Sequence, residues 1–209
     1  MNKERCETPV KWKVFLNLAL YRRFYKNQKR IIKNLLFKVK DSSNQKVLDA
    51  GCGFGRYTKI LKEYFDVYPV DISKPMVKTT YKQCRKAMVS SVDLLPFCND
   101  CFDTILCVDV TDHLESVENA MIELKRTLKK GGVMIITFGN VASPFIIMNK
   151  LVKCVLEFLK LNFRPEISKS YSKFFIKRVL RKNFKEVNIF EIPHFNGFPP
   201  TQYVAVLKK

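Results

Sequence analysis

The stretch VLDAGCGFGRYTKIL, residues 47–61, decides how this chain folds. It completes KVLDA (46–50), a short apolar run typical of a buried strand, and leads into a helical pattern that continues to Tyr64. Gly51, Gly53 and Gly55 alternate between the two, so the backbone can turn tightly and a ligand can approach its amide groups. The stretch therefore predicts a strand, a ligand-binding turn and a helix.

Two common glycine-rich phosphate motifs do not fit this turn. A dinucleotide fingerprint would need glycine at positions 51, 53 and 56, but residue 56 is Arg, whose side chain would obstruct the close approach of the helix. A P-loop would need Gly-Lys-Ser/Thr, which does not follow. The turn therefore does not favour a pyrophosphate ligand.

Strands and helices alternate outward from this unit. Strands are expected at 66–72, 88–92, 103–108 and 133–138, with helices from Ser73 to about Arg85 and from about Glu115 to Lys130, the second stopping at Gly131-Gly132. Such alternation requires right-handed crossovers and a mostly parallel sheet that is covered on both faces. The predicted fold class is α/β.

The C-terminal part follows a different order. A helix is expected near Ser172 to Asn183, followed by strands at 186–192 and 203–207. The loop between these strands is too short for a crossover helix, so the strands should be antiparallel neighbours.

Acidic side chains lie at the ends of three successive predicted strands. Asp49 lies beside the glycine turn, where it would favour a cationic ligand. Asp71 follows the first glycine by about twenty residues, where a carboxylate can accept hydrogen bonds from both hydroxyls of a ribose. Asp93 ends the third strand. Loop capping would explain each residue singly, but open α/β folds bind ligands at this edge of the sheet.

These motifs together resemble class I S-adenosylmethionine-dependent methyltransferases of the methyltransferase type 11-like kind. VLDAGCGFG matches the first motif of the family, VYPVDIS the ribose-binding strand end, SVDLLPFCNDCFDTILCVDVTDHL the third through the fourth strand, and LKRTLKKGGVMIITF the helix and fifth strand. The likeness covers residues 46–140. It implies a Rossmann-like, doubly wound sheet of seven strands, mostly parallel with an antiparallel C-terminal hairpin strand, and S-adenosyl-L-methionine as the cofactor.

The resemblance also implies roles for individual residues. The backbone around Asp49, Gly51 and Gly53 would hold the methionine part, Asp71 the ribose, Ile72 the adenine face, Asp93 with Leu94 the adenine edge, and Cys107 would lie beneath the transferable methyl group. Ile72, Leu94 and Cys107 have core packing as an alternative. No metal site is expected.

No catalytic residue is assigned. His113, just past the fourth strand, is a candidate general base, with a helix-start or packing histidine as the alternative. His194 and Tyr203 flank the last loop, where a titratable side chain is ordinarily solvated. In-line methyl transfer needs a base only if the acceptor must lose a proton.

Positive charge is concentrated at both ends of the chain. The formal net charge is +19, of which residues 1–45 and 141–209 carry +9 each. We expect a basic N-terminal helical region over 1–45 and a methyltransferase domain over 46–209 with a helical insertion at about 143–170. The basic ends suit a polyanionic partner, and solvated helix faces are the alternative.

The acceptor is expected to be a small molecule or lipid-like metabolite. The segment SPFIIMNKLVKCVLEFLKLNF (143–163) is apolar over most of its helical circumference, which suits the wall of an acceptor pocket or a contact with an anionic membrane. An RNA methyltransferase is one alternative, because Trp12, Phe15, Arg22, Arg23, Phe24 and Tyr25 mix rings with cations. However, the region after the fourth strand lacks the Asn/Asp-Pro-Pro-Tyr type of tetrad found in enzymes that methylate exocyclic base amines. A catalytically silent S-adenosylmethionine-binding protein is the other alternative.

The cysteines favour a reducing compartment. There are seven, at scattered spacings, and no apolar secretory leader opens the sequence, so a cytoplasmic protein, with peripheral membrane contact as a further option, is expected. Cys98 and Cys101 have zinc-ligand spacing, but no second pair accompanies them. A disulfide framework and an obligate protein partner are not expected.

Overall fold

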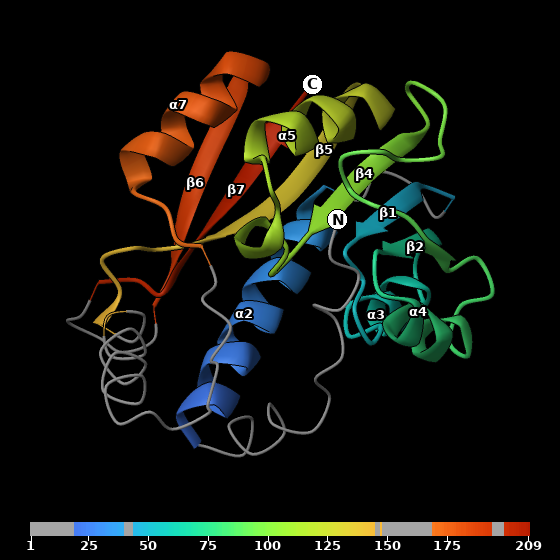
Figure 1. Cartoon of the computed structure of the whole chain (residues 1–209), viewed down its shortest axis with the longest axis horizontal. Helices are drawn as coiled ribbons and strands as arrows, with labels where there is room; N and C mark the ends of the chain where they lie inside the picture. The colour runs from blue at the N-terminus through green and yellow to red at the C-terminus, as the bar shows by residue number, and fades with distance from the viewer. Residues whose placement is uncertain (1–18, 40–43, 145–146, 148–168, 194–198) are drawn as a thin grey trace.

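A seven-stranded sheet in the order β3-β2-β1-β4-β5-β7-β6 runs through the computed structural model (Figure 1), which describes residues 19–39, 44–144, 147, 169–193 and 199–209. The strands are β1 Lys46–Ala50, β2 Asp66–Asp71, β3 Met88–Val89, β4 Phe102–Cys107, β5 Leu128–Gly139, β6 Glu186–Ile192 and β7 Gln202–Lys208. Strands β1 to β5 are parallel, and β7 is antiparallel to both β5 and β6. The predicted fold class and the antiparallel C-terminal pair are confirmed.

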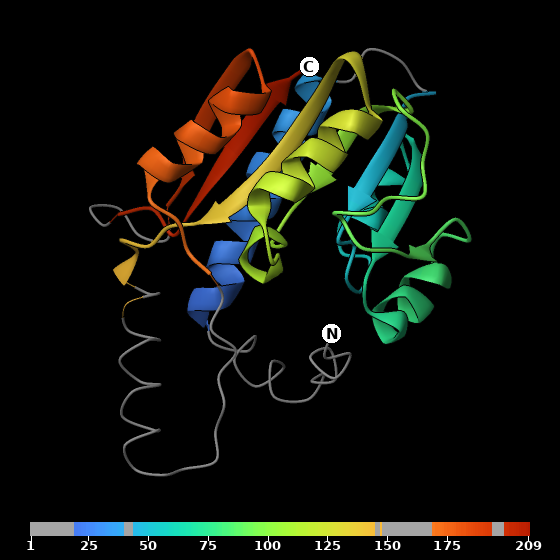
Figure 2. The same cartoon turned by 45° about the horizontal axis from the view of Figure 1, so that its top comes forward.

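Helices cover both faces of this sheet. They are α2 Ala19–Lys38, α3 Thr58–Leu61, α4 Lys74–Tyr81, the 3-10 turn η2 Thr111–His113, α5 Val117–Thr127 and α7 Lys173–Asn183. The helices α5 and α7 lie on one face of the sheet, and α2 lies on the other (Figures 1 and 2). Ser116 and Ser172 cap α5 and α7 by accepting hydrogen bonds from backbone N–H groups three residues on.

The core consists of two apolar layers, one on each face of the sheet. Successive strand residues enter opposite layers because side chains alternate along a strand: in β5, Met134 and Ile136 face α5 and α7, whereas Ile135 faces α2. Strand β4 behaves the same way. A sheet buried on both faces is what the near-continuous apolar strands of the sequence predict.

The predicted end of the helix from about Glu115 to Lys130 was wrong. Helix α5 ends at Thr127 rather than Lys130, and Leu128 already begins β5 as a fully buried residue paired with Phe102. The Gly131 N–H donates to the carbonyl of Lys209 (3.0 Å), so the glycine pair forms a bulge at the start of a strand rather than a helix cap. Burial of Leu128 outweighs the helix-stop signal of the glycines.

Other boundaries shifted by smaller amounts. Strand β3 ends at Val89 rather than residue 92, because Ser90 and Ser91 form a turn with Leu94. The first two predicted helices are shorter than expected: α3 ends at Leu61 and α4 at Tyr81.

Some predictions fall largely outside the described residues. These are the helical insertion at about 143–170, apart from a few residues at its two ends, together with His194, Trp12 and Phe15. Of the basic N-terminal region, α2 is described. Among the described helices, none combines the length and apolar character that a membrane crossing requires.

Candidate functional site

The glycine turn is attached directly to the end of β2. The amide groups of Gly51 and Cys52 both donate to the carbonyl of Val70, at 2.8 and 2.9 Å. The carbonyl of Gly53 accepts from the Thr80 hydroxyl at 2.8 Å. Gly51 has a φ of +78°, and a Cβ added there would lie 2.1 Å from a methyl carbon of Val110. The turn therefore requires glycine at position 51 for both conformation and space.

The Asp71 side chain binds the backbone of the glycine turn. It is the last residue of β2 and is 9% exposed, and its two carboxylate oxygens accept from the N–H groups of Gly53 and Ser73, each at 2.9 Å. A carboxylate has about four lone-pair positions, so two remain for a ligand. The structure thus brings together the turn and the ribose-binding candidate, as the sequence predicted.

Apolar side chains stand out of the core around this edge. Ile72 is 61% exposed, Leu94 78% and Phe54 53%. Core packing, the alternative interpretation of Ile72 and Leu94, is therefore excluded. Exposed apolar side chains beside a glycine turn offer a surface for a flat aromatic group. The sequence analysis did not name Phe54 as a site residue, although its position between Gly53 and Gly55 places it in the turn.

Cys107 differs from the other apolar candidates because it is completely buried at the end of β4. Burial, with a smaller contribution from Asp49, raises the pKa of its thiol far above the ordinary value. Cys107 is therefore a packing residue under the site and not a thiolate nucleophile.

The three predicted carboxylates do not form one cluster. Asp93 is exposed and accepts a hydrogen bond from the Ser91 hydroxyl of its own loop, and no hydrogen bond among the described residues joins it to Asp71. Asp49 lies inside β1 and is 3% exposed. Of these three carboxylates, Asp71 is the one that accepts a hydrogen bond from the backbone of the glycine turn.

Asp49 is held in an environment that disfavours its charge. Burial, assisted by the nearby charge of Asp71, raises its pKa to about 6, although the Thr58 hydroxyl donates to it at 2.5 Å and opposes the shift. A buried carboxylate beside the turn would be compensated by a cationic ligand group.

Replacing Asp49 should change how stability depends on pH. Because its folded pKa lies above its unfolded value of 3.8, the folded state binds the proton more tightly, and the unfolding free energy should fall as pH rises from about 4 through 6. A shift of this size corresponds to about 3 kcal/mol. Asp49→Asn, which still accepts from Thr58, should therefore raise stability at pH 7.5 by a few kcal/mol, to order of magnitude, and have little effect near pH 4.

Urea unfolding at both pH values measures this effect. Asp66→Asn, at the half-buried start of the neighbouring strand where Asp66 pairs with Lys86, is the matched control and should not reproduce the gain at pH 7.5. Equal effects of Asp49→Asn at the two pH values would contradict the assignment.

A buried polar network that the sequence interpretation missed lies next to this site. Asp109, at the end of β4 with a φ of +59°, accepts from Gln28 (2.7 Å) and Gln202 (2.8 Å) and pairs with Arg56. Gln28 is fully buried, and its side-chain carbonyl accepts from the Tyr57 hydroxyl at 2.9 Å. These contacts bind α2 and β7 to the carboxyl edge of the sheet.

Arg56, which argued against a dinucleotide fingerprint in the sequence, has a role in the structure that the sequence did not predict. The guanidinium does not obstruct the helix; it lies over the rings of Tyr25 (4.7 Å) and Tyr57 (4.9 Å) while it pairs with Asp109. The sequence feature that could have indicated this role is the arginine at position 56, where a dinucleotide-binding turn would carry glycine. It links the turn to α2.

A second acidic residue near Asp109 is Asp112, which lies in η2. Burial, and then the charge of Asp109, raises the pKa of Asp112 to about 6, and its carboxylate faces the backbone of Gly139 at the end of β5. His113 is exposed in η2. Both residues lie in η2, which follows β4, and the role of His113 as a base stays a prediction.

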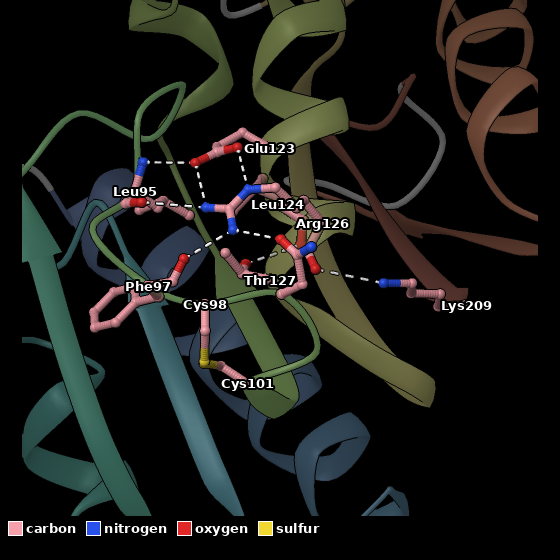
Figure 3. Close-up of a disulfide and its surroundings, with 10 residues drawn as sticks. Leu95, Phe97, Cys98, Cys101, Glu123, Leu124, Arg126, Thr127 and Lys209 are labelled. Carbon is pink, nitrogen blue, oxygen red and sulfur yellow. Dashed lines mark hydrogen bonds and ion pairs between the residues drawn. A yellow bond between two sulfur atoms is a disulfide. The ribbon is translucent and has the colours of Figure 1, made fainter.

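One disulfide was not anticipated. Cys98 and Cys101 are bonded, with their Cα atoms 5.8 Å apart (Figure 3), so they are not zinc ligands in this structure. Arg126 holds the same loop by donating to the carbonyls of Phe97 (2.8 Å) and Leu95 (3.2 Å) while pairing with Glu123. Among the described residues no group of three or more His, Cys, Asp or Glu side chains is arranged to hold a metal ion.

Comparison with known proteins matches the same part of the chain. Residues 48–136 match the family model of a methyltransferase domain. An uncharacterized protein of Methanocaldococcus jannaschii is 33% identical over 106 residues, covering 51% of this chain and 46% of that protein. The ubiquinone biosynthesis O-methyltransferase of Rickettsia canadensis is 26% identical, covering 69% of this chain and 62% of that enzyme. The chain thus spans about half the length of the first curated relatives it matches.

Solved structures agree on the fold. A SAM-dependent methyltransferase of Archaeoglobus fulgidus superposes with a TM-score of 0.73 at 18% identity, covering 96% of this chain and 100% of that one. The sheet order, the reversed last strand and the glycine turn above Asp71 define a doubly wound α/β domain with its ligand edge at the carboxyl ends of the parallel strands. Residues 48–136 thus carry a domain of the methyltransferase family, on a fold shared with solved SAM-dependent methyltransferases. The cofactor that this family implies is S-adenosyl-L-methionine, as predicted.

Proposed function

We propose that this protein transfers the methyl group of S-adenosyl-L-methionine to a small-molecule or lipid-like acceptor. The observation that carries the proposal is the contact of Gly53 with Asp71, which fixes a glycine turn and a carboxylate with two remaining lone-pair positions beside exposed apolar side chains. A nucleoside with a cationic methionine tail has the groups that such an edge would bind.

The residues of the edge suit the parts of this cofactor. Asp71 would accept hydrogen bonds from the ribose hydroxyls, and Ile72 and Leu94, with Asp93 at the exposed rim, would border the adenine. The backbone at Gly51 and Gly53 would approach the methionine part, and the charge of Asp49 would attract its ammonium group. Cys107 would form the floor beneath the methyl group.

Catalysis would depend mainly on positioning. The bound cofactor supplies an electrophilic methyl group on a sulfonium. The protein has to orient an acceptor in line with that methyl at roughly 3 to 3.5 Å and exclude water from the line. Asp112 or His113 would remove a proton at the acceptor only if the acceptor is not already nucleophilic.

The lipid-like character of the acceptor is supported by the sequence and by one comparison. The apolar segment 143–163 suits an apolar pocket wall, and the Rickettsia canadensis relative is named for ubiquinone biosynthesis. An RNA acceptor is the second candidate, favoured by the exposed basic residues of α2. Against RNA, Phe24 is buried and Tyr25 packs under Arg56, so neither ring is presented for base stacking.

Incubation of the protein with methyl-labelled S-adenosylmethionine and fractions of a cell extract tests the proposal. We expect label in a compound of the organic phase or of the small-molecule fraction, and none with Asp71→Ala. Label that precipitates with RNA would show that the acceptor is RNA and not a small molecule or lipid. Binding of the cofactor without label transfer to any fraction would favour the catalytically silent alternative.

A further inference from the structure

The helix α2 has an unusual charge distribution. Its twenty residues include seven Lys and Arg and no acidic residue. The residues Arg22, Arg23, Lys26, Lys29, Arg30 and Lys33, which we call the α2 basic face, are all exposed. Arg22, Lys26, Lys29 and Lys33 follow one another at spacings of four, three and four, which aligns them along one side of a helix.

Three lysines of this face, Lys26, Lys29 and Lys33, have no carboxylate partner among the described residues. These cations instead lie about one helical turn from one another, so each is repelled by the next. An arrangement that repels itself is stabilised by an external anionic surface.

The apolar side of α2 is already buried within this protein and is therefore not available to insert into a membrane. Phe24, Ile32 and Leu36 are buried against the sheet, and Gln28 is fully buried in the Asp109 network. Contact through α2 is therefore electrostatic docking onto a surface and not insertion of an amphipathic helix.

The position of α2 places this face beside the acceptor edge. Gln28 contacts Asp109 at the carboxyl end of β4, whereas Leu36 packs in one cluster with Val47 near the start of β1. Residues before Gln28 consequently extend past the carboxyl ends of the strands, as Figures 1 and 2 show. Arg22 and Lys26 lie on this projecting part.

We infer that the α2 basic face docks the protein on an anionic phospholipid surface. This inference rests on the proposed function, since a lipid-like acceptor would be collected from such a surface. A cluster of four to eight basic residues on one helix face is the composition that anionic headgroups attract, and it falls within that range here. On the projecting part of α2, Phe24 is buried and Tyr25 packs against Arg56, so these two rings are not presented for the base stacking that single-stranded nucleic acid uses.

Vesicle sedimentation of the full-length chain tests the inference. The wild type should bind vesicles that contain phosphatidylglycerol, bind pure phosphatidylcholine vesicles far less, and be released by high salt. The triple change Lys26→Glu, Lys29→Glu and Lys33→Glu should weaken binding by roughly 100-fold or more, since each basic residue near the surface contributes severalfold.

The helix α7 provides a matched control with the same change in net charge. Lys177→Glu, Arg181→Glu and Lys182→Glu alter three exposed residues on the opposite face of the sheet and should reduce binding far less. Equal losses in the two variants would overturn the inference, as would tighter binding of an RNA duplex through the same α2 lysines. Cofactor binding measured on the same samples separates the two proposals: absent vesicle binding with intact cofactor binding refutes only the docking surface.

Discussion

Asp71→Ala should lower the affinity for S-adenosylmethionine by roughly 100-fold or more, because two hydrogen bonds from ribose hydroxyls to a carboxylate are worth about 1.5 to 3 kcal/mol each. The same change also removes the acceptor of the Gly53 N–H (2.9 Å), so the glycine turn loses its attachment to β2. Both effects act on the cofactor, and isothermal titration calorimetry measures their sum.

Two variants separate ligand binding from damage to the turn. Asp71→Asn loses the charge and keeps one side-chain oxygen, which can accept from the N–H of Gly53 or of Ser73 but not from both, so its melting temperature should fall less than that of Asp71→Ala while it binds the cofactor at least tenfold more weakly than the wild type. Asp66→Ala changes the same residue type at the other end of β2, on the opposite edge of the sheet, and should leave affinity unchanged. Unaltered affinity in Asp71→Asn and Asp71→Ala would refute the role of Asp71.

Gly51→Ala should destabilise the fold by about 2 to 5 kcal/mol. A residue with a side chain at a φ of +78° is strained by about 1 to 2 kcal/mol. The new methyl group would also overlap a Val110 methyl carbon at 2.1 Å, and overpacking of this kind adds about 1 to 3 kcal/mol. For a chain of this size we expect the melting temperature to fall by about 10 °C.

Gly131→Ala is the matched control for this prediction. Gly131 has nearly the same φ, +75°, but a Cβ there would meet nothing within 4 Å. Only conformational strain applies, so the loss should be about 1 kcal/mol, or about 3 °C. Equal losses at the two glycines, measured by differential scanning calorimetry, would show that the contact with Val110 does not constrain the turn.

The fold was predictable from the sequence because its signals are local. Strand runs such as VMIITF, serine caps before α5 and α7, and the short connection between β6 and β7 each depend on neighbouring residues. The error at Thr127 arose where a local signal met a tertiary one: Gly131-Gly132 indicates a helix end, but Leu128 gains more by pairing with Phe102 in the core.

The candidate site was predictable only in part. Asp71 and the glycines lie eighteen to twenty residues apart in a fixed βαβ spacing, so their contact follows from the sequence pattern. In the Asp109 network, Gln28 precedes Asp109 by 81 positions and Gln202 follows it by 93. No local sequence pattern indicates such a pairing. Asp93 was expected directly at the end of the third strand, but β3 ends at Val89, so Asp93 lies in the exposed loop that follows.

The disulfide shows a similar limit. The scattered cysteines indicated a reducing compartment without a disulfide framework, yet Cys98 and Cys101, whose spacing is shared by metal ligands and by bonded pairs, are bonded. The loop that carries them is also held by Arg126 from α5, a contact between residues about thirty positions apart.

Amide chemical shifts during a titration with S-adenosylhomocysteine, the demethylated product, test where the cofactor binds. We expect saturable shifts that are largest for Gly51 through Phe54, for Ile72 and for Leu94, with the α7 amides unaffected. Saturable binding that leaves the amides of Gly51, Gly53 and Ile72 unshifted, or no binding at all, would contradict this expectation.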